Sequence, residues 1–191
     1  MNHQGTLFPE PQRMPDGFTY QDEFLEAEEE QDLLRIVANE VLHPMVFRGF
    51  EAKRKVKSYG YHYHFDSRTI TEGVPIPEGY RWLLEKVATA VSLPNTALKE
   101  LLVTEYPPGS VINWHRDAPP FELIIGISLQ SDCTFRFRPY DSDKRTRRSV
   151  IGFPLRRRSM YVMSRESRNE WEHSTAPVQT TRYSLTIRTL R

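Results

Sequence analysis

The sequence predicts an α+β protein, mainly β, in which a double-stranded β-helix (jelly roll) carries two N-terminal helices on its outer face. Three observations lead to this fold class. Two apolar stripes at helical spacing lie in the first half of the chain, short β-type runs fill the second half, and no helical pattern interrupts those runs. Several short strands in succession, separated by turn residues, are typical of a sandwich, a barrel or a jelly roll.

The chain of 191 residues, 38% of them hydrophobic, has the size and composition of one domain. We assign residues 21–191 to this domain and residues 1–20, which are rich in proline, to an extended N-terminal segment. The single cysteine excludes an internal disulfide and a thiolate metal cluster, so a metal would need histidine and carboxylate ligands. We expect a monomer in the reducing cytoplasm. We expect no membrane partner, because no apolar run approaches the length of a membrane span, about 18 residues.

The two helices are predicted from apolar spacing and from the prolines that end them. The first begins near Asp22 and ends at His43-Pro44, and the second begins after Pro77 and ends before Pro94. Their apolar faces are formed by Leu33, Leu34, Val37 and Val41 in the first helix and by Tyr80, Leu83, Leu84, Val87 and Val91 in the second.

From Leu98 onwards the sequence changes to short runs of β type, separated by Pro, Gly, Asp and Ser. These runs are LKELLVTEY, VINWH, FELIIGISLQ, CTFRFRP, RRSVIGF, SMYVMS and RYSLTIRTL. With 26 basic and 25 acidic residues, the overall charge does not favour a polyanionic partner. The basic loop from Lys144 to Arg148 is either a solvated charge run or a phosphate contact.

A candidate metal site begins with His115 and Asp117 in VINWHRD. Alternate side chains of an extended strand point the same way, so the imidazole and the carboxylate face one point. His173 in EWEHS is the candidate third ligand. Two histidines and one carboxylate form the facial triad of non-haem iron(II), which leaves positions open for a chelating cosubstrate and dioxygen.

The last run carries two arginines that strengthen this interpretation. Arg182 and Arg188 in RYSLTIR lie on the same face of an extended strand. Buried guanidinium groups need anions, and 2-oxoglutarate has one carboxylate to chelate iron and another for an arginine. The alternative is that these arginines face solvent or pair with a structural acid such as Glu105.

The segments TEYPPGSVINWHRD, EWEHS and RYSLTIR resemble the AlkB family of iron(II)- and 2-oxoglutarate-dependent dioxygenases, with its RxNLTFR ending. The resemblance covers about residues 45–191 and implies Fe(II), 2-oxoglutarate and O2. The iron ligands that it implies are His115, Asp117 and His173. The cosubstrate contacts that it implies are Tyr106 and Arg182 at the distal carboxylate, Arg188 beside the iron-proximal carboxylate, and Thr104 and Ser184 in place of two family asparagines.

The resemblance also implies a substrate-recognition lid at residues 47–65, where cations alternate with aromatic residues. Cations follow a phosphate backbone and aromatic rings stack on exposed bases. The candidate substrate contacts are Lys55, Tyr59, Tyr61 and Tyr63 in this strip, with Arg168 and Trp171 just before His173. Alternatively the tyrosines pack on the helices, Trp171 is a core residue and Arg168 shapes its loop. His62 and His64 are interpreted as packing residues rather than a second metal pair.

These observations predict an oxidoreductase that demethylates N-alkylated nucleobases of DNA or RNA, as in alkylation repair, and releases formaldehyde, succinate and CO2. The nucleic acid would be single-stranded or would present a flipped base, because a base within a duplex is inaccessible. The DNA-repair members have the pattern HxDxD, whereas Pro119 stands at the second acid here. Two alternatives remain open: the same oxygenase chemistry on a protein or small molecule, and a non-catalytic nucleic-acid-binding jelly roll.

Overall fold

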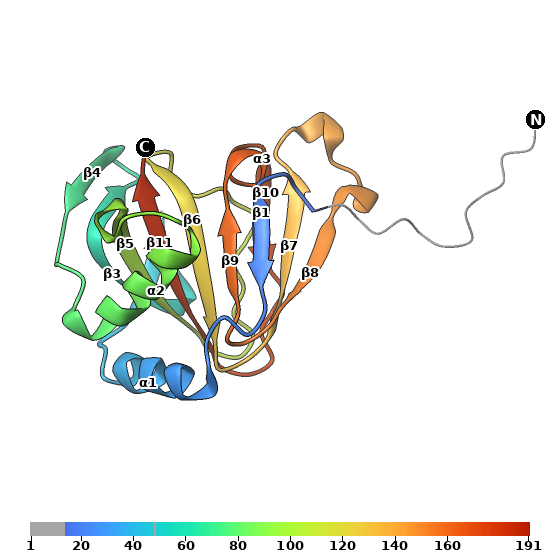
Figure 1. The fold of residues 1–191 in the computed structure, drawn as a ribbon. Coiled ribbons are helices and arrows are strands. Elements are labelled where there is room, and N and C mark those ends of the chain that lie inside the picture. The colour runs from blue at the N-terminus through green and yellow to red at the C-terminus, as the bar shows by residue number, and fades with distance from the viewer. Residues whose placement is uncertain (1–13, 48) are drawn as a thin grey trace, which may run out of the picture.

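A computed structural model describes residues 14–47 and 49–191, and it consists of two antiparallel sheets with helices on one side (Figure 1). The eight-stranded sheet has the order β1-β9-β6-β11-β5-β3-β2, and β4 pairs with β3. The second sheet has the order β10-β7-β8. The mainly β fold class predicted from the sequence is confirmed.

The bounds of the strands follow the short runs of the sequence. The large sheet contains β1 (Phe18–Gln21), β2 (His43–Phe47), β3 (Phe50–His64), β4 (Thr69–Glu72), β5 (Leu98–Tyr106), β6 (Phe121–Leu129), β9 (Met160–Met163) and β11 (Arg182–Leu190). The small sheet contains β7 (Cys133–Pro139), β8 (Ile151–Leu155) and β10 (Trp171–Thr175).

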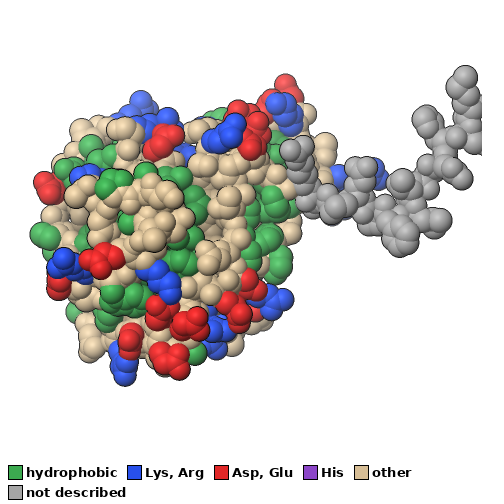
Figure 2. Space-filling view, viewed as in Figure 1, with side chains coloured by type: hydrophobic (Ala, Val, Ile, Leu, Met, Phe, Trp, Pro, Cys, Tyr) green, Lys and Arg blue, Asp and Glu red, His purple; other side chains and the backbone are tan. Residues whose placement is uncertain are grey.

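The outer face of the large sheet is covered by α1 (Ala27–Ala38) and α2 (Arg81–Ala90), as Figure 1 shows. The core beneath them joins Leu33 and Leu83 of the helices to Leu101 and Ile187 of the sheet, all fully buried. On β11 the residues alternate, so that Leu185 and Ile187 face the helices while their neighbours face the opposite side. The predicted position of the helices on the outer face is confirmed. Figure 2 shows that acidic and basic side chains are interspersed on the surface around α1.

A second core lies between the two sheets. Phe121, Ile124 and Met163 of the large sheet pack with Phe137 and Leu155 of the small one. This core closes one part of the space between the sheets, and the remaining part is open as a cavity. Within the described ranges, no helix is long and apolar enough to span a membrane.

Some predicted bounds are corrected by the structure. The first helix begins at Ala27 rather than near Asp22, because a capping box between Glu26 and Glu29 fixes its start and the preceding Leu25 turns into the core. Val41 lies beyond the helix and is 65% exposed.

Strands also occur before Leu98, in and around the segment predicted as a substrate-recognition lid: β2, β3 and β4 form two hairpins that extend the large sheet. Phe18–Gln21 is strand β1 and pairs with β9, although residues 18–20 were assigned from sequence to the extended N-terminal segment. Residues 1–13 of that segment, and residue 48 of the predicted lid, lie outside the described residues. A short helix, α3 (Arg165–Asn169), was not predicted.

Candidate active site

The loop between β5 and β6 carries two of the three predicted metal ligands. VINWH does not form a regular strand, contrary to the prediction, but its last residue, His115, forms an isolated antiparallel bridge with His173 of β10. The amide of His115 donates to the carbonyl of His173 at 3.1 Å, and the amide of His173 donates back at 2.9 Å. This bridge brings together two histidines that are far apart in the sequence.

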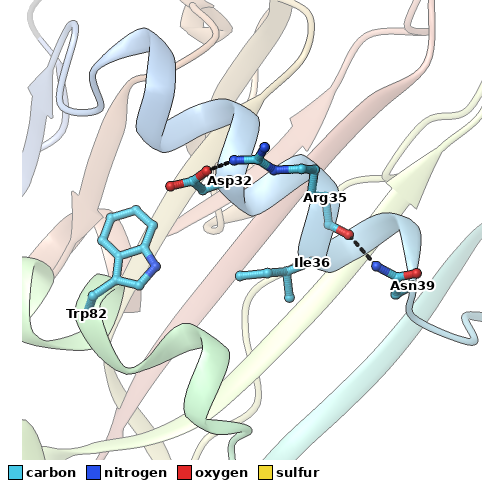
Figure 3. A pocket seen from close by; sticks show the side chains of 5 residues that line it. All are labelled: Asp32, Arg35, Ile36, Asn39 and Trp82. Atoms are coloured by element: carbon cyan, nitrogen blue, oxygen red, sulfur yellow. Dashed lines mark hydrogen bonds and ion pairs between the residues drawn. The ribbon is translucent and has the colours of Figure 1, made fainter.

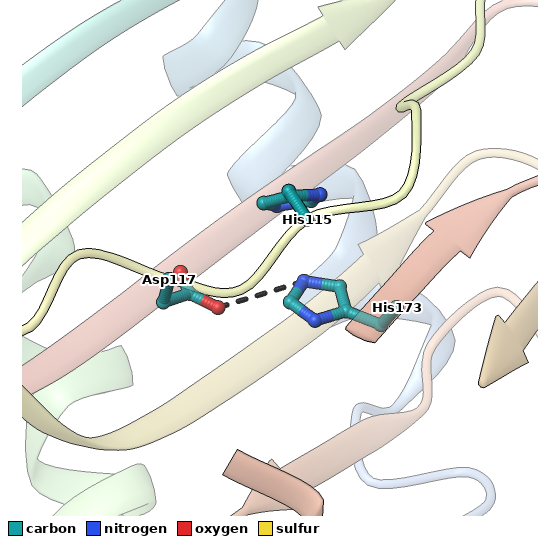
Figure 4. Close-up of side chains that lie close together, drawn as sticks. All are labelled: His115, Asp117 and His173. Atoms are coloured by element: carbon teal, nitrogen blue, oxygen red, sulfur yellow. Dashed lines mark ion pairs between the residues drawn. The ribbon is translucent and has the colours of Figure 1, made fainter. Parts of the chain in front are cut away.

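His115, Asp117 and His173 converge on one point (Figure 4). Their candidate ligand atoms all lie within 4.8 Å of one another. The two imidazole rings have centroids 4.2 Å apart, and Nε2 of His173 lies 3.5 Å from Oδ2 of Asp117. Two neutral imidazoles and one carboxylate at this spacing form a donor set for a divalent transition metal.

The environment of His173 favours a neutral imidazole. The side chain is buried, and its ring stacks on Phe135 at 5.4 Å. Burial, followed by the nearby His115, lowers the pKa of His173 to about 3 and outweighs the opposite effect of Asp117. The contact between His173 and Asp117 is therefore not an ion pair, and the imidazole keeps a lone pair for a metal.

His115 is oriented by its own loop. Its Nδ1 lies 2.8 Å from the carbonyl oxygen of Asn113. A carbonyl only accepts, so Nδ1 carries the proton and Nε2 is left free as the ligand atom. This arrangement is a common support for metal-binding histidines because it fixes both the tautomer and the ring.

Asp117 is held as a carboxylate, and only one of its two oxygens is hydrogen-bonded within the described residues. Burial by itself raises its pKa, but the charge of Arg188, together with smaller effects of the nearby His173 and His115, outweighs burial and lowers it below the ordinary range. Oδ1 accepts hydrogen bonds from Nε and Nη2 of Arg188, at 3.0 and 2.7 Å. Oδ2 is buried and has no hydrogen-bond partner among the described residues. A buried carboxylate oxygen of this kind is costly unless it coordinates a ligand, so these residues fit a metal ion.

The three residues open into a cavity of about 730 Å³ between the two sheets. Its floor is formed by cavity-facing residues of β5 and β11 that lie side by side in the register. Tyr106 pairs with Arg182 and Thr104 pairs with Ser184; further along, Leu102 pairs with Thr186 and Glu100 with Arg188. All five cosubstrate-binding residues predicted from the sequence, Thr104, Tyr106, Arg182, Ser184 and Arg188, therefore line one surface.

The Arg182 end of this floor carries a cation without an acid. Arg182 is buried, and its Nε donates to Oγ of Ser128 at 3.1 Å. Its guanidinium group lies 5.0 Å from the ring centroid of Tyr106, and Oγ of Ser184 lies 3.4 Å from the hydroxyl of Tyr106. No carboxylate of residues 14–47 or 49–191 forms an ion pair with Arg182. The alternative acid, Glu105, pairs with Lys55 instead.

Lys55 and Tyr59 lie on the opposite face of β3 from the cavity, which corrects their prediction as substrate contacts. Lys55 pairs with Glu105 at 3.3 Å. Tyr59 is 3% exposed, belongs to the core under the helices and donates to Glu40. For Tyr59 the alternative of packing on the helices is correct. Tyr61 does not line the cavity either, and Lys99 lies 6.0 Å from its ring centroid.

Tyr63 does line the cavity, near its mouth. Arg168 does not: it is 5% exposed and donates to the carbonyls of Ala118 and Phe121, at 2.7 and 2.9 Å. It therefore fixes the loop after Asp117. Trp171 packs against the core between the sheets, so its alternative as a packing residue describes it better than a wall of the cavity.

Two polar residues that line the cavity, Arg54 and Glu100, were not identified as site residues from the sequence, and neither was Ser128, the hydrogen-bond partner of Arg182. Glu100 is buried and accepts from Arg188 at 2.6 Å and from Ser58 at 3.1 Å. Each residue lies on a strand next to one that carries a predicted site residue. Alternation along those strands identifies the possible faces, but only the register shows which neighbours meet.

A second hollow of about 350 Å³ lies between α1 and α2, far from the three ligands in the fold (Figure 3). It is lined by Asp32, Arg35, Ile36, Asn39 and Trp82. Its charged groups pair with one another, since Arg35 binds Asp32, and the amide of Asn39 donates to the carbonyl of Arg35 at 2.8 Å. These contacts leave no reactive group directed into the hollow.

The family described as the 2OG-Fe(II) oxygenase superfamily matches residues 17–189, which include all three candidate ligands. The chain belongs to this superfamily. The oxygenase is also 31% identical to mouse (Mus musculus) tRNA (carboxymethyluridine(34)-5-O)-methyltransferase ALKBH8 over 171 residues, which are 86% of this chain and 25% of the relative. It thus spans about a quarter of the length of that relative. The predicted AlkB resemblance is confirmed.

Solved structures agree with the fold of the oxygenase. OsALKBH1 superposes with a TM-score of 0.72 at 16% identity and covers 93% of this chain and 99% of its own. A prolyl-4-hydroxylase from Pseudomonas putida superposes with a TM-score of 0.63 at 18% identity, with 92% of each chain covered. The oxygenase therefore uses Fe(II), 2-oxoglutarate and O2, as the sequence predicted.

Proposed function

We propose that the oxygenase removes alkyl groups from the nitrogen atoms of nucleobases in DNA or RNA. His115, Asp117 and His173 would hold the iron, which supplies oxidation of a substrate C–H bond by O2 as 2-oxoglutarate is converted to succinate and CO2. Hydroxylation of an N-methyl carbon gives a hemiaminal, which breaks its C–N bond and releases formaldehyde and the N–H base. Tyr106 and Arg182 would bind and orient the cosubstrate, and Arg188 holds Asp117 in place.

The observation that carries this proposal is the aromatic rim of the cavity. The hairpin of β3 and β4 places His62, Tyr63, His64 and Phe65 at the cavity lining. The rings of Tyr63 and Phe65 meet edge to face at 5.0 Å, and Phe65 is 52% exposed. An exposed apolar ring beside the cavity that holds the three candidate metal ligands suits an unstacked base, because stacking on an aromatic side chain stabilises it by about 1–3 kcal/mol.

Two further observations support a nucleic acid as the substrate. Arg116, next to His115, lies over the ring of Tyr140 at 3.5 Å, and Arg136 and Arg138 lie near the ring of Trp114 at 5.1 and 4.6 Å. Trp114 and Arg116 of the loop that carries two of the metal ligands therefore form cation–π pairs with β7 and with the residue that follows it, and such pairs also occur in surfaces that bind single strands. The mouse relative is named as a tRNA-modifying enzyme, which is consistent with a nucleic-acid substrate.

The proposal is tested by formaldehyde release. The full chain, with Fe(II), 2-oxoglutarate and O2, is incubated with single-stranded DNA and RNA oligonucleotides that carry N-methylated bases, and in parallel with peptides. We expect formaldehyde from at least one oligonucleotide and none with His115→Ala. Turnover on peptides alone would overturn the proposal in favour of a protein substrate. Tight, iron-independent and salt-sensitive binding without turnover would indicate a binding module instead.

The role of the rim is tested with Phe65→Ala and a matched control, Val74→Ala. Both side chains are large and exposed, at 52% and 63%, but Val74 does not line the cavity. We expect Phe65→Ala to lower kcat/KM on the oligonucleotide about tenfold, the loss of one stacked ring, without changing affinity for 2-oxoglutarate. Equal effects of the two substitutions would contradict stacking at this rim.

A further inference from the structure

Arg54 is a second cation at the Arg182 end of the cavity floor. Lys55 of β3 pairs with Glu105 of β5, which places Arg54 next to Tyr106 in the register. Arg182 flanks Tyr106 from the other side, on β11. Arg54 and Arg182 thus lie on either side of one tyrosine across three neighbouring strands, and all three residues line the cavity.

The contacts of Arg54 leave its charge unbalanced within the protein. Nη2 lies 2.7 Å from Sδ of Met45, a weak acceptor. Burial lowers the pKa of this guanidinium group, and the nearby Tyr106 opposes the effect. Within the described ranges, no carboxylate forms an ion pair with it. A partly buried guanidinium group without an acid is unfavourable, so this end of the cavity is suited to an external anion.

The opposite end of the floor shows that this lack of acids is local. Arg188 binds both Glu100 and Asp117, at 2.6 and 2.7 Å. Among the described residues, two carboxylates therefore pair with the one arginine at the metal end and none pairs with the two arginines at the other end. A carboxylate that enters the cavity is attracted to the end with Arg54 and Arg182.

We propose that Arg54 binds the distal carboxylate of 2-oxoglutarate together with Arg182 and Tyr106. The two guanidinium groups approach from β3 and β11, the strands on either side of β5, so a carboxylate between them can accept hydrogen bonds on both oxygens. Arg54 then also links the cosubstrate to the β2–β3 hairpin, since its partner Met45 lies on β2. The inference rests on 2-oxoglutarate as cosubstrate and does not depend on a nucleic-acid substrate.

The experiment measures binding directly. The full chain is loaded anaerobically with Mn(II), and the Kd values of 2-oxoglutarate and of 2-oxobutyrate, which lacks the distal carboxylate, are measured by calorimetry and competition. The variants are Arg54→Met, Arg54→Lys and the matched control Lys55→Met, one residue away on the opposite face. Thermal unfolding of each variant checks that the fold is retained.

We expect Arg54→Met to weaken 2-oxoglutarate binding about tenfold to a hundredfold, the range for charge-assisted hydrogen bonds. Arg54→Lys should recover part of this loss, and Lys55→Met should change nothing. The Kd of 2-oxobutyrate should be the same in wild type and Arg54→Met, because the carboxylate that Arg54 binds is missing.

An unchanged Kd for 2-oxoglutarate in Arg54→Met, or an equal loss for both ligands, would overturn the proposal. If the Kd is unchanged while the KM for an oligonucleotide rises, Arg54 contacts a phosphate of the substrate instead. Failure of every oligonucleotide to react would contradict the proposed function but leave this binding result standing, so the two proposals fail separately.

Discussion

The two ends of the cavity floor differ in how their arginines are neutralised. At the metal end, Arg188 is enclosed by Glu100 and Asp117 from neighbouring segments. At the other end, Arg182 and Arg54 contact a serine, a tyrosine and a methionine, and no acid among the described residues. A cation whose anions are built into the protein positions a ligand, whereas a cation without them forms a binding site. The comparison thus separates Arg188, the arginine of RYSLTIR that is paired within the protein, from Arg182, the one that we propose to bind the cosubstrate.

The largest expected effect is on the metal end. Arg188→Met leaves two buried carboxylates without their cation, since the side chains of Glu100 and Asp117 are only 5% and 4% exposed. We expect the free energy of unfolding to fall by about 3–5 kcal/mol. Denaturant unfolding of the metal-free protein measures this, with Arg165→Met, a 76%-exposed partner of Asp16, as the control for a surface ion pair. A loss of unfolding free energy similar to that of the control would show that Arg188 is not needed to stabilise the buried carboxylates of Glu100 and Asp117.

The next largest effect is expected for Arg182, at the other end of the cavity floor. Arg182→Met should change the free energy of unfolding by only about 1 kcal/mol, because no acid is left unpaired, while Ser128 loses a hydrogen bond. We expect the same variant to weaken 2-oxoglutarate binding by about 2–3 kcal/mol. Calorimetry with Mn(II) and denaturant unfolding on the same samples separate the two effects. A large loss of stability with unchanged affinity for 2-oxoglutarate would show that Arg182 stabilises the fold and does not bind the cosubstrate.

The metal end should also respond to acid. The pKa of His173 is lowered to about 3 in the folded protein, against an ordinary value of 6.5, so the unfolded chain binds a proton first as pH falls. Stability of the metal-free protein is therefore full above about pH 6.5 and is lost as pH decreases from there towards 3, by at most about 1.4 kcal/mol per pH unit. Asp117, whose pKa is also lowered, adds to the loss below its ordinary value of 3.8.

Denaturant unfolding between pH 7 and 5, with wild type and His173→Gln, tests this dependence. Glutamine cannot be protonated in this range, so the slope should be smaller in the variant. A slope that is equal in the two proteins would exclude His173 as its source.

The smallest effect is expected for Glu100. Glu100→Gln keeps an acceptor for Arg188 and Ser58 but removes one of the two charges that neutralise Arg188. Asp117 remains, so we expect a loss of about 1–2 kcal/mol in stability, less than for Arg188→Met. Unfolding of both single variants and of the double variant gives the coupling energy. No coupling would mean that Glu100 and Arg188 act independently despite their contact.

Residues with a short spacing along the chain were well predicted from the sequence. The spacing of His115 and Asp117, and of Arg182, Ser184 and Arg188, identifies sets that share one face, because the period of an extended backbone is two residues. His173 could be named as a candidate from its residue type and its neighbours. Its approach to His115 depends on a bridge between distant segments, which local periodicity does not determine.

The long strand β3 shows what periodicity leaves open. Tyr59 and Tyr63 have the same parity, yet Tyr59 is buried under the helices and Tyr63 lines the cavity. β3 leaves β5 at Gly60, where φ is +77° and an added Cβ would lie 2.1 Å from the carbonyl oxygen of Lys99, and it pairs with β4 beyond that point. The second half of the strand changes direction when it pairs with β4 in place of β5. Residues of one parity can therefore contribute to the core under the helices before Gly60 and to the cavity after it.

The sequence by itself determined the fold class, the ligand types and the face shared by the two arginines of β11. These follow from composition and from the periodicity of side chains along strands and helices. Only the tertiary structure decided which arginine receives acids. Glu100 and Asp117 reach Arg188, and Arg54 joins Arg182, through strand register and loop placement. Those contacts join residues 71 to 128 positions apart, and their charge balance exists only when the strands are paired.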